Sequence, residues 1–268
     1  METLHLYFQL VGVRVRSQMQ YRASFVVDTL GAGLAIFVEF VTLALVLARF
    51  GSISGWTLGE VAFLYGLVES AFGAMDMLFS GFDPAAFGVH IQRGTFDQFL
   101  LRPLGLPLQL FTSEFVLRRI GRILNGVLIF AISLSLTPVH WTLLKLAYLP
   151  VVFASTVLFF GGLFVLGATI CFWTVESIEV INIFTYGGTT LMSYPMHIYD
   201  EWMRRFFLFV IPSGLLVYYP ALYFLDKPDP LGLPPFAPFV APLVGAGTLL
   251  IAFSLWWVGV RHYTSTGT

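Results

Sequence analysis

The sequence predicts an all-α polytopic membrane protein with a single transmembrane domain over residues 1–268. Hydrophobic residues make up 57% of the chain and charged residues only 11%, whereas soluble domains carry roughly 25% charged residues. Apolar runs of about 20 residues recur along the whole length, and each is long enough to cross a hydrocarbon core of about 30 Å. Six spans are expected, at residues 24–47, 57–80, 115–137, 146–173, 177–194 and 236–260.

The first segment, residues 4–21, is predicted to be an amphipathic helix. Its apolar residues recur at helical spacing, and Arg14 and Arg16 lie between them. A basic amphipathic helix of this kind lies on an anionic membrane surface. The segment is too polar to cross the membrane.

The four spans that follow form two predicted hairpins. A short turn from Gly51 to Gly55 joins the spans at 24–47 and 57–80. A turn that begins near Pro138 joins the third and fourth spans.

Between the second and third spans, residues 82–114 are too polar and too broken by proline to cross the membrane. A short helix is expected to break at Gly94, resume, and end before Pro103. Large apolar side chains in such a loop indicate an exposed patch that contacts another protein. They are Phe87, Ile91, Phe96, Phe99 and Leu100.

After the fifth span, the apolar run 206–225 is split by Pro212 and Pro220. We expect a pair of helices that enters the membrane and returns, covered by protein because its backbone is broken. The face that receives both termini carries more Lys and Arg than the other, so both termini are predicted to be cytoplasmic. The loop 82–114 is then cytosolic and the re-entrant helices lie outside.

Of the carboxylates inside predicted spans, Glu39, Glu69 and Asp76 are the candidates for function, because a charge there costs a few kcal/mol unless it is paired or faces water. Glu39 and Glu69 lie at similar depth below their shared turn, so they are expected to face one cavity. Both a polar lining of a transport path and a contact between helices fit these two residues. Asp76 lies on the face of Glu69, and its candidate partners are three nearby arginines: Arg118, Arg119 and Arg122.

Residues for covalent or metal chemistry are not evident. Neither Lys145 nor Lys227 follows a glycine, so the chain lacks a P-loop for ATP. The five histidines lie on separate segments without metal-ligand spacing, and the lone Cys171 permits no internal disulfide. We therefore expect no cofactor in this chain and no nucleic-acid partner.

Two stretches carry a resemblance to a known family. One lies after the second span and comprises Ile91, Gly94, Asp97, Leu100, Arg102 and Pro103. The other comprises Tyr194, Pro195, Pro212, Tyr219 and Pro220. They resemble the coupling segment and the outer re-entrant segment of type-2 ATP-binding-cassette (ABC) exporter permeases, in particular the six-span subfamily that pairs two permeases with a separate ATPase.

The resemblance implies a permease subunit that moves an amphiphilic or lipid-like cargo out of the cytoplasm by alternating access. ATP and Mg²⁺ would bind to partner ABC ATPase subunits, and a second permease, identical or different, would complete the pathway. The first, second and fifth spans would line the path with Glu39, Glu69 and Asp76, and the second stretch above would form the exit gate. The residues implied in ATPase coupling are Phe87, His90, Ile91, Arg93, Gly94, Asp97, Leu100, Arg102 and Pro103.

Other functions remain open on the sequence alone. A proton-coupled secondary transporter would use Glu39, Glu69 and Asp76 as a proton relay. A lipid-modifying enzyme would need a cluster of His, Asp or Asn at one interface, and the sequence shows none. A purely structural role in a larger complex leaves the coupling-like segment unexplained.

Overall fold

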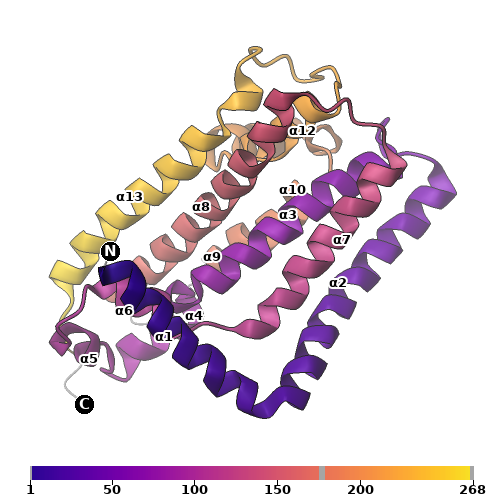
Figure 1. Cartoon of the computed structure of the whole chain (residues 1–268). Coiled ribbons are helices and arrows are strands. Elements are labelled where there is room, and N and C mark those ends of the chain that lie inside the picture. Colours follow the sequence, from indigo (N-terminus) through magenta and orange to yellow (C-terminus); the bar gives the residue numbers. More distant parts are fainter. Residues whose placement is uncertain (1, 175–178, 266–268) are drawn as a thin grey trace.

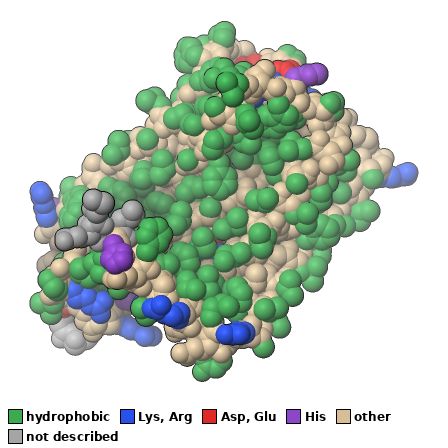
Figure 2. All heavy atoms as spheres, in the orientation of Figure 1, with side chains coloured by type: hydrophobic (Ala, Val, Ile, Leu, Met, Phe, Trp, Pro, Cys, Tyr) green, Lys and Arg blue, Asp and Glu red, His purple; other side chains and the backbone are tan. Residues whose placement is uncertain are grey.

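The computed structural model describes residues 2–174 and 179–265, and within them it contains helices and no β-strand. Five of the described helices are long and apolar enough to cross a membrane. Figure 2 shows hydrophobic side chains over the long flank of the molecule, with lysines and arginines towards its ends. The all-α polytopic prediction is therefore confirmed. The candidate spans are His5–Phe50, Leu58–Leu78, Leu117–Leu136, Leu143–Thr174 and Ala241–His262.

The N-terminal helix changes direction where the sequence changes from amphipathic to apolar. Helix α1 (Glu2–Gln18) is joined through a 3₁₀ turn at Met19–Tyr21 to α2 (Arg22–Phe50). Figure 1 shows α1 crossing one end of the bundle while α2 runs along its flank. The chain thus turns between residues 4–21 and the predicted span 24–47, whose bounds stay a prediction.

Helix α3 (Leu58–Leu78) occupies the centre of the bundle, where it is buried on nearly all sides. It packs between α7 (Ile120–Leu136) and α8 (Leu143–Thr174), while α13 (Ala241–His262) lies along α8 and α2 lies along α7. A capping box between Thr57 and Glu60 starts α3.

Glycines allow α3 and α7 to approach closely. A Cβ atom added to Gly66 would lie 2.5 Å from the backbone nitrogen of Phe130, and one added to Gly126 would clash with the backbone nitrogen of Ser70. Small residues permit such close contact between membrane helices. In lipid the hydrophobic effect does not drive helices together, so close packing of this kind is what associates them. The contact fixes the register of α3 against α7.

The segment between α3 and α7 contains three short helices, α4 (Pro84–Gln92), α5 (Phe96–Leu101) and α6 (Leu106–Ser113). Gly94 has a φ of +65°, a left-handed conformation that favours glycine, and it separates α4 from α5. The predicted break at Gly94 and end before Pro103 are both confirmed.

The predicted exposed apolar patch on this segment is wrong for most of its residues. Phe87 and Phe96 are 0% exposed, and Ile91 and Phe99 are also buried. They are buried because α4 and α5 rest on the ends of α8 and α13. The apolar character of the residues does not by itself reveal that these helices cover them. Only Leu100, at 44%, is exposed as predicted.

The fifth predicted span, residues 177–194, stays a prediction. Its first two residues lie outside the described part of the chain. The structure describes a helix formed by α9 (Glu179–Asn182), a π-helical turn at Ile183–Gly187, and α10 (Gly188–Met192). This described helix is shorter than the roughly 20 residues of a full crossing.

Beyond α10, two helical pieces at Glu201–Val210 and Ser213–Phe224 meet at an angle of 75°. The predicted break at Pro212 is confirmed. Pro220 instead lies inside α12 (Tyr218–Phe224), which it does not split because proline is tolerated in the first helical turn. A bend of this size fits either a broken span or a re-entrant pair. The last span, predicted at 236–260, forms α13.

The start of α1 and the end of α13 lie at the end of the bundle that carries α4–α6, and α12 lies at the opposite end (Figure 1). This arrangement agrees with an even number of crossings.

We predict that Gly126→Ala lowers the unfolding free energy by about 2 kcal/mol, because the added methyl group forces α7 away from α3. Thermal unfolding of the purified protein in detergent measures the change. Gly247→Ala is the matched control, since no atom lies within 4 Å of an added Cβ at that position. Equal effects of the two substitutions would contradict close packing at Gly126.

Candidate functional site

A cavity of about 490 Å³ opens between α2, α3 and the end of α10. Glu39 and Glu69 both line it, as the depth argument predicted. Its walls mix carboxylates and hydroxyl groups with aliphatic side chains. The lining residues are Glu39, Thr42, Leu43, Val46, Ile53, Tyr65, Glu69, Thr190, Ser193 and Tyr194.

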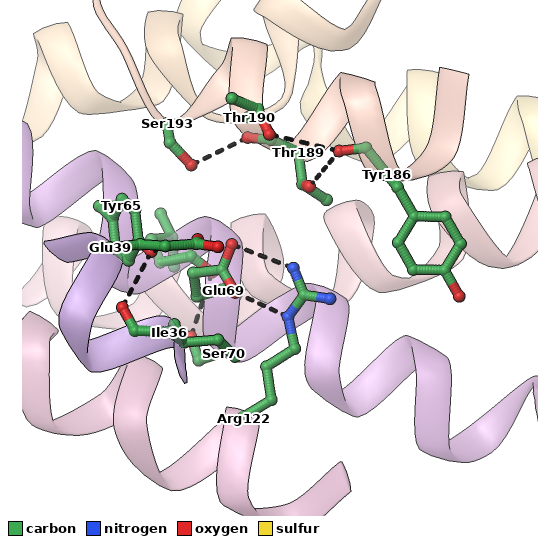
Figure 3. Close-up of polar contacts among 11 residues, drawn as sticks. Ile36, Glu39, Tyr65, Glu69, Ser70, Arg122, Tyr186, Thr189, Thr190 and Ser193 are labelled. Atoms are coloured by element: carbon green, nitrogen blue, oxygen red, sulfur yellow. Dashed lines mark hydrogen bonds and ion pairs between the residues drawn. The ribbon is translucent and has the colours of Figure 1, made fainter. Parts of the chain in front are cut away.

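Glu69 forms a buried, bidentate ion pair across the contact between α3 and α7. The Nε atom of Arg122 lies 2.6 Å from one carboxylate oxygen, and its Nη2 atom lies 3.1 Å from the other (Figure 3). The guanidinium group also stacks 4.3 Å from the centre of the Phe72 ring. Glu69 is therefore neutralised by a neighbour and ties two helices together, which was one of its two predicted roles.

Glu39 has a different environment from Glu69. Its side chain is on an exposed face of α2 and forms no ion pair with any described residue. Its one hydrogen bond is long, with the Tyr65 hydroxyl 3.4 Å away, and that hydroxyl also lies 3.3 Å from the carbonyl of Ile36. Of the two carboxylates, Glu39 is the one whose charge is available to groups inside the cavity.

The wall opposite Glu39 is lined by hydroxyl groups at the end of α10. Ser193 donates to the carbonyl of Thr189 at 2.8 Å, and Thr190 donates to that of Tyr186 at 3.5 Å (Figure 3). Each hydroxyl thus donates its proton to a carbonyl of its own helix, and its oxygen can still accept a hydrogen bond. Tyr194, a predicted gate residue, completes this wall.

Asp76 does not line the cavity. It pairs at 2.6 Å with Arg119, one of the three predicted partners. Arg119 also donates to the hydroxyl of Ser80 at 2.8 Å and lies 3.9 Å from Asp83, the residue that caps α4. The predicted path residues therefore separate into a cavity group and an ionic cluster at the base of α4.

The other predicted gate residues are spread over the outer segment. Pro195 is buried and precedes a 3₁₀ turn, while Pro212 stands at the 75° bend. Tyr219 donates to Asp229 at 3.2 Å, and Pro220 is buried within α12. Only Tyr194 reaches the cavity.

Sequence reasoning missed a set of contacts that joins the turn between α2 and α3 to the outer segment. His197 lies 2.9 Å from the carbonyl of Ser54, and Trp56 stacks on Tyr218 at 5.7 Å between ring centres. Lys227 pairs with Glu60 at 2.7 Å. No local pattern marks these residues as neighbours, since well over a hundred positions separate the two segments.

The nine predicted coupling residues divide into an internal and a surface group. Phe87 and Ile91 are buried, His90 is bonded to Thr95 at 2.9 Å, and Asp97 accepts a hydrogen bond from Ser265 at 2.6 Å. Gly94 forms the turn between α4 and α5. The side chains exposed at the surface are Arg93, Leu100, Arg102 and Pro103.

A family model described as ABC-2 family transporter protein matches residues 34–267. No curated protein and no solved structure matches the chain.

We predict that Glu69→Ala and Arg122→Ala each lower the unfolding free energy by about 3–5 kcal/mol, because each leaves a buried charge without its partner. The double variant should lose much less than the sum of the two. Unfolding in mixed micelles, analysed as a double-mutant cycle, measures the coupling. Glu39→Gln serves as the control and should change stability by less than about 1 kcal/mol. Additive losses would show that the ion pair does not hold α3 to α7.

Proposed function

The chain belongs to the ABC-2 family of transporter proteins, and we propose that it is the permease subunit of an ATP-driven exporter. It hydrolyses no ATP itself; ABC ATPase subunits bind ATP and Mg²⁺, and a second permease completes the pathway. The protein lies in the inner (cytoplasmic) membrane of the cell, with both termini and the segment α4–α6 on the cytoplasmic side.

The observation that carries this proposal is the rigid attachment of α4 to the membrane helices. The Phe87 ring packs 5.4 Å from that of Phe172 near the end of α8, and 5.1 Å from Trp256 in α13. Because these aromatic contacts are buried and close-packed, a displacement of α4 is transmitted to both helices.

A second attachment links the same segment to α3 and α7. Arg119, just before α7, pairs with Asp76 near the end of α3 and lies 3.9 Å from Asp83, the residue that caps α4. An ATPase that moves α4 therefore acts on several spans together, which is what rigid-body alternating access requires.

The division of the coupling residues suggests separate tasks. Arg93, Leu100 and Arg102 are exposed and are placed to contact the ATPase. Phe87 and Ile91 are buried and transmit the motion instead.

The cavity beside Glu39 supports an amphiphilic cargo. Leu43 and Val46 offer apolar contact, while Glu39 and the hydroxyls at the end of α10 accept hydrogen bonds. The cavity draws on α2, α3 and α10, the segments assigned to the path, and a second permease placed against α2 would enclose it.

We predict that Leu100→Glu prevents the ATPase from co-purifying with this chain, because it places a charge in an apolar contact. Phe87→Ala should leave co-purification intact and lower the amount of cargo moved per ATP hydrolysed several-fold. Pull-down from membranes and reconstituted transport measure the two effects.

Leu143→Glu is the matched control for Leu100→Glu, since Leu143 is 85% exposed at the opposite end of α8. It should leave both co-purification and coupling intact. Coupled transport that is unchanged in the Phe87 and Leu100 variants would refute the proposal that α4 receives the motion of the ATPase and transmits it to the spans.

A proton-coupled secondary transporter is the second candidate, favoured by the row of charged residues Glu69, Arg122, Asp76 and Arg119. The ion pairs weaken this candidate, because a neighbouring arginine favours the charged form of a carboxylate over the protonated form that a proton relay needs.

We predict that vesicles containing this chain without an ATPase show no transport under an imposed pH gradient. Tracer uptake or efflux measures this directly. Transport that follows the gradient and is abolished by Glu39→Gln would establish the second candidate instead.

A further inference from the structure

A second cavity, of about 610 Å³, lies between α1 and the segment α4–α6. Its walls come from α1 and from the three consecutive helices α4, α5 and α6. The lining residues are Leu10, Val13, Arg14, Val89, His90, Arg93, Thr95, Gln98, Phe99, Arg102, Leu104, Gln109, Thr112, Ser113 and Glu114. The proposed function places Arg93 and Arg102 of this lining at the ATPase contact, and it gives the cavity between them no occupant.

The cavity has a cationic lining. Arg14 enters from α1, Arg93 from the turn after α4, and Arg102 from the end of α5, against a single acidic residue, Glu114. Burial lowers the pKa of His90, so this histidine is neutral near pH 7 and adds no charge. Three guanidinium groups around one cavity favour a phosphate, which they bind through paired hydrogen bonds.

A buried acceptor in the same cavity lacks a donor. The side chain of Gln109 is 4% exposed, and its Nε2 atom donates to the carbonyls of Phe99 at 2.9 Å and Leu104 at 2.8 Å. Its Oε1 atom accepts no hydrogen bond from any described group. An unsatisfied buried acceptor is costly, so a hydrogen-bond donor is expected there.

Neighbouring groups in the cavity wall are also acceptors. Thr112 donates to the carbonyl of Leu108 and Ser113 to that of Leu110, both at 2.9 Å. Their hydroxyl protons are therefore used, and their oxygens remain as acceptors. With Glu114, this wall complements hydroxyl or ammonium groups rather than a second phosphate.

The position of α1 connects the cavity to the membrane surface. Gln18 accepts a hydrogen bond from the backbone of Leu117 at 2.9 Å and donates to the carbonyl of Phe115, which fastens the end of α1 beside α7. Leu10, Val13 and Val89 provide apolar lining next to the arginines. Basic amphipathic helices of this composition lie at the level of lipid headgroups.

We propose that this cavity binds the headgroup of a phospholipid. Arg14, Arg93 and Arg102 surround its phosphodiester, while Gln109 and Glu114 accept hydrogen bonds from the hydroxyl or ammonium group beyond it. The bound lipid joins α1 to the segment α4–α6. This assignment does not depend on the cargo or on an ATPase.

The test uses the full chain purified in detergent, without ATPase, and dihexanoyl phosphatidylglycerol as the probe. Native mass spectrometry measures the dissociation constant. The variant Arg14→Gln, Arg93→Gln, Arg102→Gln should bind the probe at least about tenfold more weakly, since one charge-assisted contact contributes about that factor. Inorganic phosphate at equal concentration should displace little of the probe.

The control variant Arg16→Gln, Arg22→Gln, Arg261→Gln removes the same charge from exposed arginines outside the cavity. It should keep affinity within about twofold. An equal loss in both variants would mean general electrostatic attraction and would overturn the proposal. Efficient competition by inorganic phosphate would indicate a site for a free anion. Unchanged binding in the cavity variant would mean that these arginines do not bind lipid and serve the ATPase contact alone. Either result would also overturn it.

Discussion

The contact between α3 and α7 is the constraint on which the rest of the structure depends. Gly66 and Gly126 let the two backbones meet without side chains between them, and this sets the register of the helices. Both intramembrane ion pairs, Glu69 with Arg122 and Asp76 with Arg119, cross the same contact. The buried charges are tolerated because the packing brings each to its partner.

The same constraint separates three carboxylates that look alike in sequence. Glu69 and Asp76 face α7 and are paired, whereas Glu39 lies on α2 and faces the cavity. The ion pairs thus give Glu69 and Asp76 a part in holding helices together. Under the proposed function, Glu39 is the carboxylate left to contact the cargo. Asp76 adds a link to α4 through Arg119, which connects the centre of the bundle to the segment proposed to receive the motion of an ATPase.

Local sequence predicted the elements whose causes are local. The break at Gly94, the end before Pro103 and the bend at Pro212 follow from the backbone limits of glycine and proline, and they appear as expected. Pro220 was misjudged because its effect depends on its place in a helix, and it lies in a first turn. Phe87 was misjudged because its cover comes from α8 and α13, far along the chain.

The sequence by itself determined that this chain is a helical membrane protein, since apolar runs of spanning length and few charges leave no alternative in water. It also placed Glu39 and Glu69 near one cavity, because helical rise fixes depth. Only the tertiary structure decided that Arg122 neutralises Glu69 and that His197 and Lys227 hold the outer segment to the first hairpin. It also decided that Arg14, Arg93 and Arg102 line one cavity between α1 and the segment α4–α6. These depend on how helices rotate and pack against one another, and no local pattern encodes that rotation.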